Sequence, residues 1–429
     1  MGVTAHARFL MDVSNDYHVC PAPVMRNRSK KALAGLRVVE YAGFVAGPYC
    51  AKLLADMGAE VVKVEEPAAG DDARRWGPFR GDAPHPEKSG LFLYLNTNKL
   101  GMTLNPRLAT GREVFLRLAA ASHIVIEDSP PGVMEELGLG YQALSEANPA
   151  LVMVSITPFG QKGPYAGYKG YYLNTYHSGM LGHITPVGSS LPDREPLKSG
   201  GLLGEFACGL VAAVATLGAS YARQVSGHGQ HVDVSKQEAL VGLGRMNAAS
   251  FANGVRCPSR TVRLSGRGGM IPCRDGHVCV HIPENHQWAG LVEIMGFPEW
   301  ATDERYKTTA GRMLHLNEVM PRIREWASSH TKEEIYHPAQ RLSSTVTPVM
   351  TAEDVVNSQQ AKARGFIREI EHPEAGGFRY PTSPFLFSRT PWTLERPAPC
   401  LGEHNEEILV GRLGFSREEL AEMAAMGVI

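Results

Sequence analysis

Residues 36–50 read LRVVEYAGFVAGPYC, and residues 53–67 read LLADMGAEVVKVEEP. An apolar run, a turn at Ala46-Gly47-Pro48, a helix, Gly58 and a second apolar run make up a βαβ unit of the kind that handles nucleotides. The turn opens the helix, and the free N–H groups at a helix N-terminus suit phosphates and carboxylates. The stretch therefore predicts an α/β fold with an anion-binding site at the start of its first helix.

The composition is that of a globular protein, with 43% apolar and 20% charged residues in a chain of 429. A net charge of −1 gives no basic field for nucleic acid or an anionic membrane. Seven scattered cysteines argue against a disulfide framework, and no Cys-x-x-Cys pair or histidine cluster suggests a metal site. No signal-peptide pattern begins the chain, and the apolar segment 206–222 is too short and too interrupted by glycine to predict a membrane span. We expect a cytoplasmic protein.

Strand-like and helix-like segments alternate along the first half of the chain, which predicts a parallel, doubly wound sheet. Pro130-Pro131-Gly132 ends one of the strands, and Thr157-Pro158-Phe159-Gly160 ends another. The expected strands are 38–41, 60–64, 123–127, 151–156 and part of 227–234, and the expected helices are 112–122, 133–137, 206–222 and 240–252.

Three regions follow from these patterns. Residues 1–33 read as an N-terminal extension, and residues 34–235 with 346–429 as a large Rossmann-like domain. Residues 236–345 change character, with a glycine-rich loop at 263–270 and a strand at 278–282, and predict linker helices and a smaller α+β domain.

Short motifs follow one another in a fixed order: Asn98-Lys99, GLGY at 138–141, Asn148-Pro149, FGQKGPY at 159–165, GHGQHVDV at 227–234 and LGEH at 401–404. Together they resemble the family III coenzyme A transferases, the formyl-CoA and carnitine-CoA transferase group, over residues 33–429. The resemblance implies that CoA passes between carboxylic acids through an aspartyl anhydride and an enzyme–CoA thioester. It also implies an interlocked dimer, and a CoA thioester as substrate rather than a permanently bound cofactor.

The family places its aspartate nucleophile just ahead of an apolar helix, and the step that we match to it here is Gly204-Glu205. A glutamate is still a carboxylate and could attack a thioester, but it carries one more methylene, and a misplacement of about 1 Å can cost on the order of 100-fold in rate. Alternatively, Glu205 is a helix-start carboxylate favoured by the helix dipole. Both interpretations stay open.

Several residues that the resemblance places around CoA carry a negative charge where the family has a positive one. Glu66 and Glu136 stand where relatives have arginines, and Asp128-Ser129 replaces an Asn-Phe segment. Arginine is well suited to phosphate, so these changes predict weak CoA binding. If the alignment is shifted by a residue, other cations could serve instead: Lys63, Arg74, Arg75, Arg107 and Lys169.

The remaining candidates are less decisive. Tyr171-Tyr172 follows Gly170 where relatives have Tyr-Asp or His-Asp, which disfavours a racemase and leaves the tyrosines as a possible wall of the site. The loop Gly266-Arg267-Gly268-Gly269 either closes over a substrate carboxylate or is a surface turn. The candidate CoA and substrate residues are Val45, Ala46, Glu66, Leu104, Arg107, Asp128, Ser129, Glu136, Lys169, Tyr171, Tyr172, Arg267, Gly268 and Gly269.

The sequence therefore predicts a subunit of a family III CoA-transferase that is not itself catalytic, with a homologous subunit that keeps the aspartate as its partner. By analogy with succinyl-CoA:benzylsuccinate CoA-transferase, the donor would be succinyl-CoA and the acceptor a substituted succinate. Two alternatives are an active homodimer that uses Glu205 and a scaffold or regulatory protein without chemistry.

Overall fold

The structure, a computed structural model, describes residues 31–186, 193–255 and 268–429. It divides into two compact units, and within these ranges the first holds the residues up to Thr175, Gly200–Leu240 and Arg368–Ile429, while the second holds Tyr176–Ser199 and Val241–Ile367. These boundaries differ from the expected ones, because residues 176–199 and 346–367 belong to the second unit and residues 236–240 to the first. Most of the expected N-terminal extension lies outside the described residues.

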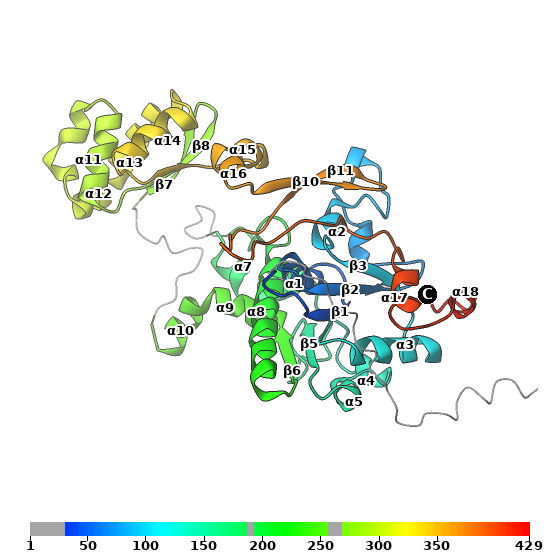
Figure 1. Cartoon of the computed structure of the whole chain (residues 1–429). Helices are drawn as coiled ribbons and strands as arrows, with labels where there is room; N and C mark the ends of the chain where they lie inside the picture. The colour runs from blue at the N-terminus through cyan, green and yellow to red at the C-terminus, as the bar shows by residue number, and fades with distance from the viewer. Residues whose placement is uncertain (1–30, 187–192, 256–267) are drawn as a thin grey trace, which may run out of the picture. The chain divides into compact units, whose positions relative to one another are not determined.

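A six-stranded parallel sheet forms the centre of the first unit, as the sequence predicts (Figure 1). The strand order is β3-β2-β1-β4-β5-β6, so the direction of winding reverses between β1 and β4. Open α/β sheets bind ligands outside the carboxyl ends of the strands at such a reversal. The strands are β1 (Arg37–Tyr41), β2 (Glu60–Glu65), β3 (Leu100–Thr103), β4 (Ile124–Glu127), β5 (Val152–Thr157) and β6 (His231–Ser235).

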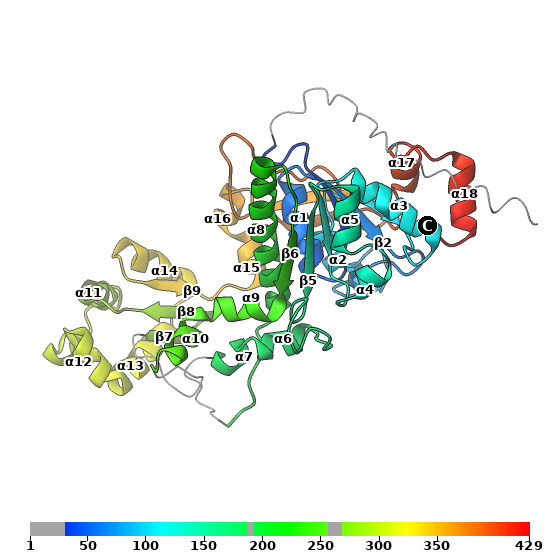
Figure 2. The same cartoon turned by 90° about the horizontal axis from the view of Figure 1, so that it is seen from below.

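Helices cover both faces of this sheet, with α1 and α8 on one side and α3 and α5 on the other (Figure 2). The structure thereby confirms a doubly wound α/β fold. The helices that begin in this unit are α1 (Ala46–Asp56), α2 (Gly90–Leu95), α3 (Ala109–Ala120), α4 (Val133–Glu136), α5 (Tyr141–Ala147), α6 (Tyr172–Ser178), α8 (Leu203–Ser226), α9 (Lys236–Leu243), α17 (Asn405–Leu409) and α18 (Arg417–Ala425), with short 3-10 turns η1 (Asp72–Arg75) and η2 (Arg80–Asp82).

Helices α1 and α8 pack closely because α8 carries a glycine where they meet. A Cβ on Gly209 of α8 would lie 2.6 Å from the Ala46 carbonyl oxygen of α1. By length and composition α8 is the one helix of the described chain that could cross a membrane, but Cys208, Ala212 and Thr216 on one of its faces are buried. One face of α8 is therefore a core face, as the sequence predicts.

The tail of the chain completes the core on the α3 face. Ile408, Leu409 and Val428 pack with buried residues of the sheet and of α3. The Asn105 N–H donates to the Val428 carbonyl over 2.7 Å, and the His404 N–H donates to that of Gly101 over 2.9 Å. A two-stranded sheet of β10 (Ile367–His372) and β11 (Gly376–Pro381) precedes this tail.

The second unit is a smaller α+β body, as expected, built on an antiparallel sheet of β7 (Gly268–Cys273), β8 (Gly276–His281) and β9 (Val346–Pro348). Because β9 pairs with β8, this unit extends beyond the expected end at residue 345. The expected helix 240–252 is two helices, α9 and α10, on either side of Gly244. The unit contains α7 (Leu181–Ile184), α10 (Arg245–Ala252), α11 (Asn285–Ile294), η3 (Glu299–Thr302), η4 (Glu304–Tyr306), α12 (Thr309–Leu314), α13 (Leu316–Ser328), α14 (Lys332–Arg341), α15 (Ala352–Asn357) and α16 (Gln359–Ala363).

Candidate active site

The loop after β1, residues 42–45, lies at the reversal of the sheet and is held by side chains of β2 and of the residue before η1. The Phe44 N–H donates to Asp71 Oδ1 over 2.8 Å. Lys63 Nζ donates to the Ala42 carbonyl over 2.9 Å. Phe44 has a φ of +62°, a left-handed backbone that non-glycine residues rarely adopt. The hydrogen bonds keep the loop in this conformation.

Asp128, which follows β4, binds the same loop. The Gly43 N–H donates to both of its carboxylate oxygens, each at 3.1 Å. Burial raises the pKa of Asp128 to about 7, and Glu127 and Asp71 add to the rise, although the Lys236 ammonium and the Gly43 N–H oppose it. Asp128 is thus a carboxylate whose charge is costly where it lies.

Glu205 lies in the first turn of α8, as the sequence predicts, but its carboxylate is only 3% exposed. Lys236, the first residue of α9, donates from Nζ to Glu205 Oε2 over 2.8 Å. Burial opposes the charge of Lys236, yet Glu205 and Asp128 together hold its pKa above the usual value. Glu205 therefore binds this ammonium group directly, and the charge of Asp128 also stabilises it.

The structure brings most of the predicted CoA residues of the first unit to one edge of the sheet. Val45 and Ala46 begin α1, Leu104 follows β3, and Ser129 follows Asp128, with its N–H donating to Glu127 Oε2 over 2.7 Å. Burial raises the pKa of Tyr41 at the end of β1, Arg107 lowers it, and Glu66 and Asp128 raise it, so these three charges surround one hydroxyl group. The exposed residues of the predicted set are Glu66, Arg107, Glu136, Lys169 and Tyr171.

Two of the cations that could have replaced the missing arginines form buried ion pairs inside the protein. Lys63 is fully buried and binds Glu40 at 3.0 Å and Asp71 at 2.7 Å. Arg74 is 1% exposed and binds Glu65 at 2.7 Å and Glu87 at 2.6 Å. Neither side chain can meet a ligand, so Arg75, Arg107 and Lys169 are the exposed cations among the five candidates.

Aromatic side chains border this edge. Tyr172, at the start of α6, lies with its ring centroid 6.4 Å from that of Phe44 and 6.2 Å from that of Trp76. Tyr171 beside it is 73% exposed. Tyr172 therefore lies beside the loop after β1, and the role of the two tyrosines as a wall of the site stays a prediction.

The glycine-rich segment belongs to the second unit. Gly268 and Gly269 are not in a loop but begin strand β7, paired with His281 and Val280 of β8. Arg267 lies outside the described residues. Nothing in the structure relates this segment to the residues at the edge of the parallel sheet.

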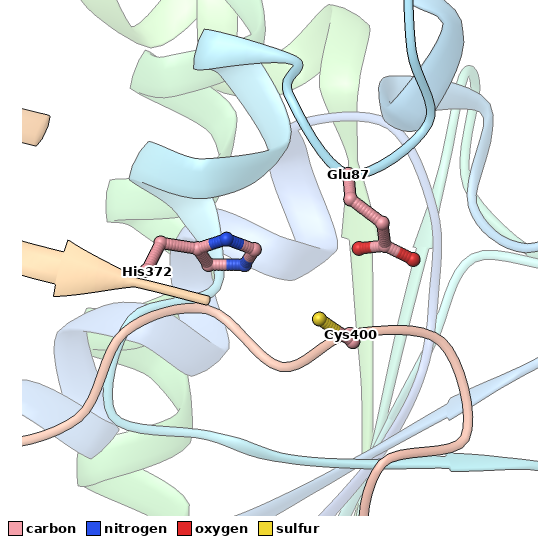
Figure 3. Close-up of side chains that lie close together, drawn as sticks. All are labelled: Glu87, His372 and Cys400. Atoms are coloured by element: carbon pink, nitrogen blue, oxygen red, sulfur yellow. The ribbon is translucent and has the colours of Figure 1, made fainter. Parts of the chain in front are cut away.

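Glu87, His372 and Cys400 form a separate cluster whose ligand-type atoms lie within 4.8 Å of one another (Figure 3). His372 Nδ1 accepts from the N–H groups of Glu374 at 3.2 Å and Ala375 at 3.1 Å, so the ring proton sits on Nε2. A metal-bound histidine instead donates from its second nitrogen. Burial and the Glu87 charge raise the pKa of the Cys400 thiol to about 11. This geometry suits a structural cluster rather than a metal ligand set.

Sequence reasoning missed Lys236, Asp71 and the partners of Phe44. Lys236 directly follows the motif-bearing strand and begins an apolar helix, a position where a lysine is conspicuous. Asp71 and Trp76 flank η1, which shows no hydrophobic period. Their roles depend on contacts between distant segments.

The pKa of Asp128 predicts a pH-dependent stability. An unfolded aspartate titrates near 3.9, whereas folded Asp128 titrates near 7. The folded state therefore binds the proton more tightly, and stability falls as pH rises from about 4 to about 7. Asp128→Asn should raise the free energy of unfolding by about 2 kcal/mol at pH 8 and by much less at pH 4.5. Urea denaturation of both proteins at the two pH values measures this, and an equal effect at both would contradict it.

The comparisons with known proteins agree with one another. The model of CoA-transferase family III matches residues 33–405. Similar curated proteins include a succinyl-CoA–D-citramalate CoA-transferase of Chloroflexus aurantiacus, 31% identical over 94% of this chain and 99% of the relative. A formyl-CoA:oxalate CoA-transferase of Streptomyces coelicolor is 33% identical over 93% of this chain and 99% of the relative. A CaiB/BaiF family protein from Brucella suis, known from its crystal structure, is 30% identical in sequence. The match covers 89% of this chain and 99% of that protein, and the two structures superpose with a TM-score of 0.79. The chain is a member of CoA-transferase family III.

Proposed function

We propose that this chain is the non-catalytic subunit of a CoA-transferase assembly that moves CoA between carboxylic acids. One observation carries the proposal: the Glu205 carboxylate is 3% exposed and bound to Lys236 over 2.8 Å. A nucleophilic carboxylate must approach the thioester carbon to about 3–3.5 Å, and one of its oxygens must be free to attack. The Glu205 carboxylate is buried, so a thioester cannot approach it, and it is paired with Lys236, so it is not free.

The neighbouring carboxylates offer no substitute nucleophile. Asp128 accepts from the Gly43 N–H through both oxygens. Asp71 accepts from Phe44 and Ala73 and pairs with Lys63. Each acidic side chain that touches the loop after β1 is thus bound by donors of the chain itself, which supports covalent chemistry on a different subunit.

The outer face of α8 supports an assembly. Contiguous apolar surface on a protein marks a contact with another molecule. A stripe along this helix is exposed in the described chain, and it consists of Leu203, Leu210, Val214, Tyr221 and Val225. We propose that a homologous chain covers it, either a subunit that keeps the aspartate or a second copy in an interlocked dimer.

The names of the relatives support a dicarboxylate substrate. One acts with succinyl-CoA and citramalate, another with formyl-CoA and oxalate, and a third, a succinate–glutarate CoA-transferase of Agrobacterium fabrum, is 32% identical over 90% of this chain and 96% of the relative. We propose succinyl-CoA as donor and a substituted succinate as acceptor, exchanged in the cytoplasm without a permanently bound cofactor.

The test compares the isolated chain with a co-purified assembly. The chain alone should neither transfer CoA from succinyl-CoA to an acid nor gain the mass of CoA in a mass spectrum. It should bind free CoA more weakly than micromolar, because the exposed Glu66 and Glu136 take the places of arginines that would bind phosphate. The assembly with an aspartate-bearing homologue should do both. Turnover by the pure chain would overturn the proposal and favour an active homodimer, and an inactive assembly would favour a scaffold.

Substitutions of Glu205 separate the two enzymatic alternatives. In the assembly Glu205→Gln should change turnover per folded molecule by less than about threefold, because the group forms no anhydride. In the isolated chain Glu205→Asp should create no activity, since Glu66 and Glu136 remain. If Glu205 were the nucleophile, Glu205→Gln would lower turnover by several orders of magnitude. Steady-state assays of CoA transfer decide between these results.

A further inference from the structure

The start of α1 already has an anion beside it, which is the carboxylate of Asp128. We propose that Asp128 acts as an internal ligand of this position and excludes the anionic groups of other molecules, phosphate or carboxylate, from it. Asp128 is then a residue that determines what this edge of the sheet can bind. The inference rests on the proposed function and deepens it, because it names a group that keeps the site of this chain closed to CoA.

Asp128 makes the contacts that a bound anion would make. Both of its carboxylate oxygens accept from the Gly43 N–H, each at 3.1 Å. A Cβ built on Gly47, the second residue of α1, would lie 3.8 Å from Asp128 Oδ2, so the carboxylate lies against the first turn of the helix. Free N–H groups and the positive end of the helix dipole make such a place suitable for anions. The carboxylate therefore occupies the position that a ligand anion would take.

The helix itself supplies no acid for this place. Val45, the N-cap residue, makes no side-chain cap hydrogen bond, and the first turn of α1 contains no acidic residue. Asp71 also binds the loop after β1, but its charge is matched by Lys63 at 2.7 Å. Among the ion pairs of the described residues Asp128 has none, because Lys236 binds Glu205 instead. Asp128 is thus a carboxylate that serves the backbone of the loop and the helix start.

This arrangement lowers the stability of the folded chain. The charged and titratable groups that face Asp128 are Glu127 on β4, Asp71 before η1, Lys236 on α9 and Tyr41 at the end of β1. Burial and the two carboxylates raise the pKa of Asp128 to about 7, although the Lys236 ammonium and a backbone N–H oppose the rise. Residues that reduce stability are common where function requires them. Because Asp128 is partly exposed, an incoming anion would meet its charge directly.

Calorimetric titration of the full chain with sulfate and with succinate tests the inference. Sulfate resembles a phosphate dianion, and its charge does not change between pH 6 and pH 8, while succinate offers carboxylates. Asp128→Asn keeps the shape and one oxygen for the Gly43 N–H but removes the charge, and Asp128→Ala empties the position. At pH 8 both variants should bind at least one of the two anions roughly tenfold or more tightly than the native chain, because the like charge is gone. A gain for sulfate alone would assign the position to phosphate, and a gain for succinate alone would assign it to the acid.

The native chain should also bind the same anion more tightly at pH 6 than at pH 8, because Asp128 is then mostly protonated. This gain should be much smaller in Asp128→Asn. An equal gain in both proteins would mean that other groups cause it and would count against the inference.

Asp233→Asn is the matched control. Asp233 on β6 also accepts from one backbone N–H through both oxygens, that of Gln161 at 3.0 Å each, but this N–H belongs to a loop and not to a helix start. Its anion affinity should stay within about threefold of the native value, since exposed charges are screened. Unchanged affinity in the folded Asp128 variants, or an equal gain in Asp233→Asn, would overturn the inference, and thermal melts establish which variants are folded. CoA transfer by the pure chain, with the Asp128 variants still binding the anion more tightly, would overturn the subunit proposal alone.

Discussion

Replacing Lys236 by methionine should lower the free energy of unfolding by about 3–5 kcal/mol, which is the usual cost of leaving a buried charge without its partner. The Glu205 carboxylate is 3% exposed and Lys236 is 15% exposed, so water cannot take over the role of the ammonium group. The pKa of Asp128 should also rise, because Lys236 opposes its elevation. Urea denaturation at pH 7.5 measures the first effect, and a pH series of the same experiment measures the second.

The double variant Lys236→Met/Glu205→Gln is the control. It removes both charges, so most of the lost stability should return, since replacing a buried pair by neutral groups is often nearly free. Lys236→Arg should retain much of the stability by keeping the charge. If the single and double variants were equally destabilised, the loss would come from packing at the start of α9 and not from the unpaired carboxylate.

A comparable loss, again about 3–5 kcal/mol, is expected for Arg74→Met. The guanidinium donates from Nε to Glu65 Oε2 at 2.7 Å and from Nη2 to Glu65 Oε1 at 2.8 Å, and Nη1 reaches Glu87 Oε2 at 2.6 Å. It also lies over the Phe92 ring, 3.6 Å from the centroid. Methionine fills part of the volume but leaves the buried Glu65 without its cation.

Arg74→Lys sharpens this experiment. A lysine keeps the charge but cannot form the two-pronged contact with Glu65, so stability should fall by an intermediate amount. Arg75→Met is the matched surface control, because this neighbouring side chain is 55% exposed and pairs with Asp72 at the surface. A loss of CoA affinity with stability unchanged in Arg74→Met would show that Arg74 serves a phosphate instead of the interior.

The sequence predicted the parallel sheet because its strands are apolar runs bounded by glycine and proline, and burial on both faces requires such runs. It missed β3, whose four residues Leu100–Thr103 include Gly101 and carry little strand propensity. The sequence also did not predict that the expected helix 240–252 is split at Gly244, or that β9 pairs with β8. Both features depend on contacts that no local pattern shows.

The candidate site was predictable only in outline. The position of Glu205 at a helix start could be read from one segment, whereas its partner Lys236 is 31 residues away. For Lys63 and Arg74 the sequence was misleading. A charged residue in a sequence suggests solvent, and only the fold shows that Glu40, Asp71, Glu65 and Glu87 surround these cations. The roles of individual residues in CoA binding stay predictions.

The contacts of the tail with β3 have a consequence for biosynthesis. The N-terminal half supplies the parallel sheet, but Ile408, Leu409 and Val428 belong to the same core. During translation this core stays open until residue 428 has left the ribosomal tunnel, while residues 241–367 of the second unit have already emerged. The nascent first unit must therefore expose the apolar residues of β3 and α3 that α17 and α18 later cover, and a chaperone has that interval in which to bind them.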